Sequence, residues 1–203
     1  RIVEFGLQGA DVTADWQGDA GGSDVQLQSA AGNIEFRLAL PGRHNVVNAL
    51  AASAAAMAAG AGLAAVKAGL ETLSPVAGRF KVHSLPGDIT LIDDTYNANP
   101  ESLQVALDVL ALADGESWLV LGDMGELGAG AAELHSAAGR KARQAGVTRL
   151  YGLGELAASA VSAFDGPGGA YTTMDELLTA LRSELSGPLH ILVKGSRRMR
   201  MER

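Results

Sequence analysis

A run of polar residues, 93–102, contains the side chains of this chain that are best suited to chemistry. Asp93 and Asp94 are adjacent carboxylates at the end of a short apolar run, and amide and hydroxyl groups follow them. Asn99 and Pro100 have a structural interpretation, because asparagine is favoured as a helix N-cap and proline as the first helical residue. That interpretation leaves the two carboxylates unexplained, so we predict a functional site at this run.

A second cluster, residues 121–128, places Asp123 and Glu126 among glycines. Its spacing differs from that of Walker and dinucleotide loops, and its carboxylates would repel a phosphate. The cluster suits a contact to ribose hydroxyls, to an amine or to a metal-bound water, and a tight strand-to-helix turn explains it equally well. His135, in the helix predicted to follow, is expected to have a packing or capping role.

A third cluster begins at Lys194, which we expect at the end of a strand, and continues with Gly195 and Ser196 at the start of a helix. Such a segment offers a cation, a hydroxyl and free backbone N–H groups to an anion. The alternative for Ser196 is a plain N-cap role. The arginines that follow are interpreted as a solvated face.

In the first half of the chain, His44, Asn45 and Asn48 open an alanine-rich helix. Asn45 and Asn48 lie three positions apart, so their amides share one helix face. An amide offers both a donor and an acceptor, which suits the edge of adenine. Considered alone, capping by Asn45 is the simpler interpretation. Arg79 is a cation near a predicted domain boundary, where it could reach across an interdomain cleft.

The apolar pattern predicts the elements that must position these side chains, and a break at residues 74–78 divides them into domains 1–77 and 78–203. In the first domain a turn at 31–33 joins two strands into an antiparallel hairpin. The predicted strands are 2–7, 25–28 and 34–38, and the predicted helices are 45–59 and 63–73.

In the second domain short apolar strands alternate with helices, which favours an α/β fold with a mostly parallel sheet covered on both faces. The predicted strands are 80–84, 89–93, 118–121, 149–151 and 190–193, and the predicted helices are 101–112, 131–145, 155–164 and 175–185. Ligands of such sheets bind beyond the carboxyl ends of the strands. The three clusters of the second domain are all expected there.

Composition excludes several classes of protein. The chain has no cysteine, so thiolate metal sites and disulfides are excluded, and its net charge of −7 argues against a general nucleic-acid binder. The most apolar segment, residues 49–65, is rich in alanine and indicates a buried helix rather than a membrane span. We therefore expect a cytoplasmic protein with no membrane partner.

Several segments, taken together and in this order, resemble the Mur ligases. They are Gly42-Arg43-His44-Asn45-Val46-Val47-Asn48-Ala49, Gly78-Arg79-Phe80, Asp93-Asp94-Thr95-Tyr96-Asn97-Ala98-Asn99-Pro100, Leu121-Gly122-Asp123-Met124-Gly125-Glu126-Leu127 and Lys194-Gly195-Ser196-Arg197. The resemblance covers the chain from Gly42 onward. It implies the end of a central ATPase domain followed by most of a Rossmann-like C-terminal domain.

The resemblance also implies an activity. Such ligases use ATP and Mg²⁺ to convert a substrate carboxylate into an acyl phosphate, which an incoming amine then attacks. The run from Asp93 to Pro100 is most similar to the branch of the family that joins D-alanyl-D-alanine to UDP-N-acetylmuramoyl-tripeptide, for peptidoglycan synthesis.

Residue by residue, the resemblance implies three groups of site residues. Asn45 and Asn48, with His44 beside them, match the adenine contacts of the central domain. Arg79 and Asp94 match a catalytic pair that the C-terminal domain presents to ATP when it closes. The amino-acid substrate is expected at Asn97, Lys194 and Ser196.

The chain departs from the family pattern by an absence. It contains no Gly-rich loop ending in Gly-Lys-Thr or Gly-Lys-Ser, and the metal ligands and modified lysine that the family places upstream are also missing. We therefore expect a piece of a longer enzyme, with most of the Mg²⁺ and phosphate binding upstream, and we expect this piece alone to be inactive.

Two alternatives remain open. One is a sibling ligase that adds another amino acid, although the Asp-Asn-Pro-Arg motif of the diamino-acid-adding enzyme is absent. The other is a non-catalytic domain that holds a nucleotide or a cell-wall precursor.

Overall fold

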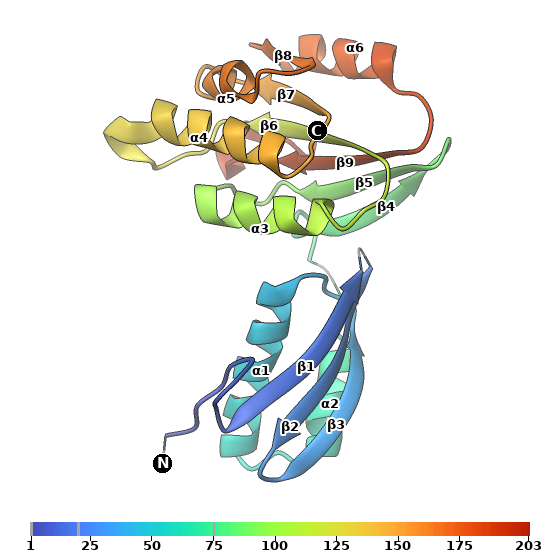
Figure 1. Cartoon of the computed structure of the whole chain (residues 1–203), viewed down its shortest axis with the longest axis vertical. Helices are drawn as coiled ribbons and strands as arrows, with labels where there is room; N and C mark the ends of the chain where they lie inside the picture. The colour runs from blue at the N-terminus through green and yellow to red at the C-terminus, as the bar shows by residue number, and fades with distance from the viewer. Residues whose placement is uncertain (1, 20, 75) are drawn as a thin grey trace. The chain divides into compact units, whose positions relative to one another are not determined.

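A computed structural model of the chain describes residues 2–19, 21–74 and 76–203. The chain consists of two compact units, residues 1–75 and 76–203, which are described separately below (Figure 1). No helix in the described parts of the chain is long and apolar enough to span a bilayer.

Unit 1 is an antiparallel sheet packed against two helices. Its strands β1 (Val12–Asp19), β2 (Gly22–Ser29) and β3 (Gly32–Leu38) pair in the order β1-β2-β3, and α1 (Arg43–Ala58) and α2 (Leu63–Glu71) follow. Alternate strand residues, such as Val25 and Leu27, are buried against Leu50 of α1 and Leu70 of α2. The predicted β2–β3 hairpin and both predicted helices are confirmed.

One strand prediction in this unit is wrong. Residues 2–7 form no strand and contribute only an isolated bridge between Phe5 and Val12. The segment bends back on itself, and the Glu4 N–H donates to the Asp11 carboxylate at 3.0 Å. The strand β1 was not predicted, because its inward-facing residues Val12, Ala14 and Trp16 are followed by polar and glycine residues at 17–19, which leaves only a short alternation.

Unit 2 contains a six-stranded sheet in the order β4-β5-β9-β6-β7-β8. The strands are β4 (Lys81–Leu85), β5 (Ile89–Asp94), β6 (Glu116–Gly122), β7 (Arg149–Leu153), β8 (Gly168–Tyr171) and β9 (Leu189–Lys194). All neighbouring pairs are parallel except the hairpin of β4 and β5. The α/β prediction is confirmed. The strand β8 was not predicted, because its sequence Gly-Gly-Ala-Tyr has little strand propensity.

The helices of unit 2 lie on the two faces of this sheet. The core on one face joins α3 (Pro100–Leu110), α4 (Ala131–Gln144) and α5 (Ala157–Phe164) to alternate strand residues, including Leu119 and Leu192. The core on the other face joins α6 (Met174–Glu184) to Val120 and Ile191 of the intervening positions. Neighbouring residues of one strand therefore point to opposite faces and meet different partners.

Strand order brings distant parts of the sequence to one edge of the sheet. The strand β9 lies between β5 and β6, so Lys194 is in register with Asp94 on one side and with Leu121 on the other. The carboxyl ends of these parallel strands therefore meet, which is where open α/β sheets bind their ligands.

Candidate functional site

Asp93 and Asp94 serve opposite faces of the sheet. In β5, Leu91 and Asp93 line a groove on the α6 face, whereas Ile92 is buried in the core beneath α3. By the alternation of a strand, Asp94 shares the face of Ile92. The two carboxylates, equivalent in the sequence, therefore have different surroundings.

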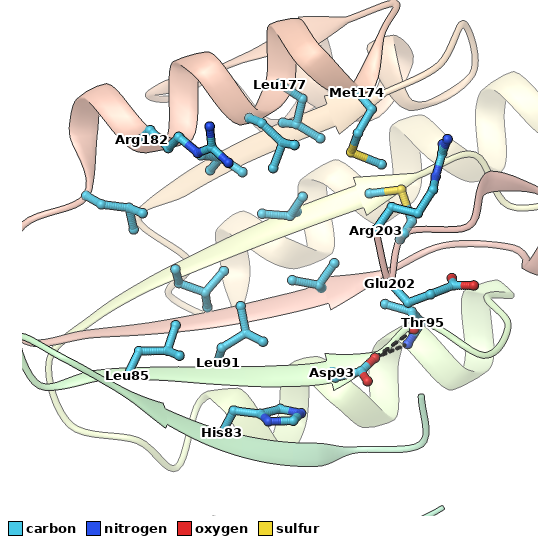
Figure 2. Close-up of a pocket in the computed structure, with 17 residues that line it drawn as sticks. His83, Leu85, Leu91, Asp93, Thr95, Met174, Leu177, Arg182, Glu202 and Arg203 are labelled. Atoms are coloured by element: carbon cyan, nitrogen blue, oxygen red, sulfur yellow. Dashed lines mark hydrogen bonds between the residues drawn. The ribbon is translucent and has the colours of Figure 1, made fainter. Parts of the chain in front are cut away.

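Asp93 links the segment around Gly78 to the turn that follows β5 at Thr95. Its Oδ1 accepts hydrogen bonds from the Thr95 N–H at 3.2 Å and the Thr95 hydroxyl at 2.7 Å (Figure 2). Its Oδ2 accepts from the Gly78 N–H at 3.2 Å, and the Gly78 carbonyl accepts from the Tyr96 N–H at 2.8 Å. Gly78 has φ 72°, and a Cβ there would lie 3.0 Å from the Tyr96 nitrogen, so glycine is required.

Asp94 forms a buried ion pair with Lys194. The Lys194 Nζ lies 2.5 Å from Asp94 Oδ2, and only 2% of the lysine side chain and 16% of the aspartate side chain are exposed. The same Nζ donates to the Asn97 carbonyl at 2.9 Å, and Asp94 Oδ1 accepts from the Phe80 N–H at 3.2 Å. A buried ion pair is tolerated only when such additional hydrogen bonds satisfy both groups.

Arg79 and Asn97 provide exposed polar groups beside this pair. The Arg79 guanidinium lies over the Tyr96 ring, 4.3 Å from its centroid, and both side chains are exposed. The Asn97 side chain is exposed, and its oxygen accepts from the Ala98 N–H at 2.9 Å. A stacked, solvent-accessible cation beside a buried carboxylate suits an anionic ligand such as a phosphate.

Ser196 and Asp123 connect the ends of β9 and β6. The Asp123 carbonyl accepts from the Ser196 hydroxyl at 2.6 Å and from the Ser196 N–H at 3.0 Å. The predicted helix after Gly195 is wrong, since residues 197–199 form a single 3₁₀ turn that Arg200 ends at φ 46°. The Ser196 hydroxyl proton is therefore used inside the protein, although its oxygen can still accept a hydrogen bond.

The Asp123 carboxylate has a structural role that the sequence did not indicate. Its Oδ1 accepts from the Ala157 N–H, at the start of α5, at 2.8 Å. Gly154 approaches so closely that a Cβ there would lie 2.4 Å from this carboxylate. An acidic side chain directly after β6 thus caps a helix that follows β7.

His135 is fully buried below the same loop. Its Nε2 accepts from the Met124 N–H at 2.9 Å, and its Nδ1 lies 2.7 Å from the Ala131 carbonyl oxygen. Accepting at Nε2 and donating at Nδ1 requires the neutral imidazole. The expected packing role of this histidine is confirmed.

The groove on the α6 face has a volume of about 520 Å³. Aliphatic side chains of β5, β6, β9 and α6, including Leu91 and Leu177, form most of its wall, and Asp93 and Thr95 lie at one end (Figure 2). Asp94 and Lys194 do not line it.

The predicted nucleotide residues lie in unit 1, at the start of α1. The helix begins at Arg43 after the N-cap Gly42, so capping by Asn45 is wrong. The Asn45 amide nitrogen instead donates to the Pro41 carbonyl at 2.8 Å, and the exposed Asn48 lies one turn further along. His44 is half-buried beside them.

Thus Asp94, Lys194 and the backbone of Asn97 are in contact, and Arg79 is held next to them by the Phe80 and Gly78 hydrogen bonds. In the described ranges, no group of three or more histidine, aspartate or glutamate side chains has the arrangement of a metal site.

Two family models match the chain. The one described as "Mur ligase, glutamate ligase domain" matches residues 78–197, and the one described as "Mur ligase middle domain" matches residues 1–56.

Curated proteins and solved structures give the same result. The UDP-N-acetylmuramoyl-tripeptide–D-alanyl-D-alanine ligase of Escherichia coli (strain K12) is 42% identical over 183 residues, which are 89% of this chain and 40% of that protein. The ligase of the same name from Haemophilus influenzae is 40% identical over 185 residues, covering 89% of this chain and 40% of that protein. The crystal structure of MurF from Acinetobacter baumannii matches with a TM-score of 0.89 and 33% identity, over 100% of this chain and 45% of that one. This chain therefore spans about two fifths of the length of these curated relatives.

Proposed function

This chain belongs to the Mur ligase family, and from that premise we propose that it is part of an ATP-dependent ligase that joins D-alanyl-D-alanine to UDP-N-acetylmuramoyl-tripeptide. The observation that carries the proposal is the 42% identity, over 89% of the chain, to a ligase named for this reaction. We place the enzyme in the cytoplasm, in the synthesis of peptidoglycan precursors.

We assign residues 1–77 to the end of the central domain and residues 78–203 to the C-terminal domain. The two matched family models, at 1–56 and 78–197, support this division. The separation of the chain into two compact units is compatible with it.

The side chains at the start of α1 suit adenine. Because the Asn45 amide nitrogen donates to Pro41, its oxygen is directed to accept, as a contact with the exocyclic amine of adenine needs. The exposed Asn48 can both donate and accept one turn away. His44 is half-buried beside them and is included in this adenine site.

Mg²⁺ is assigned no step on this chain. The parts of the chain that the structure describes contain no cluster of three or more carboxylate or histidine groups that fits such an ion.

The proposed reaction has two steps. The tripeptide carboxylate attacks the γ-phosphorus of ATP, forming an acyl phosphate and releasing ADP. The amine of D-alanyl-D-alanine then attacks the acyl carbon, inorganic phosphate leaves, and the amine nitrogen loses a proton.

The exposed Arg79 guanidinium suits the negative charge that develops on the phosphate oxygens. We propose that Asp94 is the other member of a catalytic pair with Arg79, facing ATP, with the adjacent Lys194 ammonium offsetting its negative charge. Asn97 and the accepting oxygen of Ser196 are assigned to the amino-acid substrate. Lys194, which the resemblance also placed at this substrate, contacts the Asn97 carbonyl.

The proposal can be tested by complementation. The segment of the E. coli relative that matches this chain is replaced by the chain, and the hybrid gene is expressed in cells depleted of their own ligase. Growth is expected, and growth should be lost with Arg79→Ala. If the hybrid is folded and abundant but cells do not grow, the alternatives of a sibling ligase or a non-catalytic binding domain are favoured.

A further inference from the structure

Lys194 differs from an ordinary surface lysine at a strand end. Its side chain is 2% exposed, whereas Lys81 at the start of the neighbouring hairpin is exposed. An ammonium group is strongly hydrated in water, so burial is unfavourable unless protein groups replace that hydration. The partners of Lys194 therefore indicate what its charge does.

Among the described residues, the two hydrogen-bond partners of this ammonium lie on one short segment of the chain, residues 94–97. The Nζ contacts the Asp94 carboxylate at 2.5 Å and the Asn97 carbonyl at 2.9 Å. Asp94 is the last residue of β5, and Asn97 lies two residues before the N-cap of α3. One buried cation thus binds the two ends of the turn between this strand and this helix.

The contacts of Lys194 also affect the position of Arg79. The second oxygen of Asp94 accepts from the Phe80 N–H at 3.2 Å, so the position of Asp94 also fixes the backbone directly after Arg79. The Tyr96 ring, under the Arg79 guanidinium, is carried by the turn that Lys194 holds. Both members of the proposed catalytic pair therefore depend on one lysine.

We propose that Lys194 is a positioning residue, which holds Asp94 and the turn 94–97 in place rather than contacting the amino-acid substrate. Its burial leaves almost no ammonium surface for a ligand, and Asp94 already neutralises its charge. The catalytic consequence rests on the function proposed above, whereas the structural consequence does not.

The structural consequence is tested on the 203-residue chain by amide hydrogen exchange. Lys194→Met keeps an unbranched side chain but removes the charge, so the Asp94 carboxylate should leave its place. Exchange of the Phe80 N–H, which donates to Asp94, should become at least about tenfold faster, because a protected amide exchanges through local opening. The Gly78 N–H, which donates to Asp93 on the other face, serves as the internal control and should change little.

Two further variants complete this test. Lys81→Met makes the same substitution at an exposed lysine and should leave both amides unchanged. If Lys194→Met unfolds unit 2, the double variant Lys194→Met/Asp94→Asn removes both charges and should restore the fold. Because no ammonium then holds the side chain at position 94, the Phe80 N–H should still exchange faster than in the unsubstituted chain. Unchanged Phe80 exchange in a folded Lys194→Met chain would overturn the proposal.

The catalytic consequence is tested in the hybrid ligase with a double-mutant cycle. Lys194→Met should lower kcat by up to about a hundredfold, as expected for a displaced catalytic group. The KM for D-alanyl-D-alanine should change by less than about threefold, and Lys194→Met should cost little more once Asp94 is already asparagine. If Lys194 contacts the substrate directly, Lys194→Met should instead raise the KM for D-alanyl-D-alanine, and by the same factor whether residue 94 is aspartate or asparagine. That result would overturn the proposal.

Failure of the proposed function is recognised separately. If Asp94→Asn leaves kcat unchanged in an active hybrid, Asp94 has no catalytic role, and the exchange of the Phe80 amide alone decides whether Lys194 positions it.

Discussion

Replacing Asp94 with asparagine should destabilise unit 2 more than the same replacement at Asp93. Asp94→Asn leaves the Lys194 ammonium, 2% exposed, without its counter-charge. Breaking a buried pair in this way costs about 3–5 kcal/mol. Asp93→Asn keeps an oxygen for both Thr95 donors and loses mainly the hydrogen bond from the Gly78 N–H, a cost of about 1–2 kcal/mol.

The assay is urea unfolding of the 203-residue chain followed by tryptophan fluorescence. Trp118 is 2% exposed in the core of unit 2, and Trp16→Phe removes the other tryptophan, which lies in unit 1. The free energy of unfolding reported by Trp118 should therefore fall by different amounts in the two variants.

The double variant Lys194→Met/Asp94→Asn is the control for this comparison. It should recover most of the stability that Asp94→Asn loses, because two matched neutral side chains replace a buried pair at small cost. Equal, small losses at Asp93 and Asp94 would refute the claim that the buried ammonium depends on Asp94.

Three further predictions concern the other residues. In the hybrid ligase, Asn45→Ala or Asn48→Ala should raise the KM for ATP more than it lowers kcat, as steady-state kinetics with varied ATP will show. Each lost contact should weaken ATP binding by about 1–3 kcal/mol. Arg79→Ala should lower kcat strongly in the same kinetics. The double variant Arg79→Ala/Asp94→Asn should have a kcat only slightly lower than that of the worse single variant. The pKa of Glu176 is lowered, chiefly by the hydrogen bond from the Thr173 hydroxyl. The ionised Glu176 side chain should therefore stabilise α6 fully above the pKa of the unfolded chain, and this stabilisation should be lost as pH falls through the lower pKa of the folded chain. An NMR titration in which the pKa of this carboxyl is at or above the ordinary value for glutamate would contradict this.

The sequence predicted the helices and strands better than it predicted which side chains contact one another. The helices of unit 2 have apolar positions at helical spacing, and Asn99 caps α3 in the structure as expected. The pair of Asp94 and Lys194 was not predicted, because the two residues are 100 positions apart and meet only through the placement of β9 beside β5. The apolar pattern identifies strands but does not order them.

The different roles of Asp93 and Asp94 were likewise only partly accessible. Strand alternation shows that two adjacent residues point to opposite faces, but it does not show which face holds a buried lysine. The link from Asp123 to the start of α5 has the same origin, since it joins a residue after β6 to a helix after β7. The useful signal in each case was a polar residue at the end of a predicted strand.

The central claim is that this chain is part of a ligase that forms an amide bond with D-alanyl-D-alanine. The most direct measurement is release of inorganic phosphate by the purified hybrid ligase, with ATP, UDP-N-acetylmuramoyl-tripeptide and either D-alanyl-D-alanine or a single amino acid as the amine. We predict release that requires the dipeptide and falls strongly in Asp94→Asn, with the amide product detected by mass spectrometry. Release that is supported equally by a single amino acid, or that is unchanged in Asp94→Asn, would contradict the account.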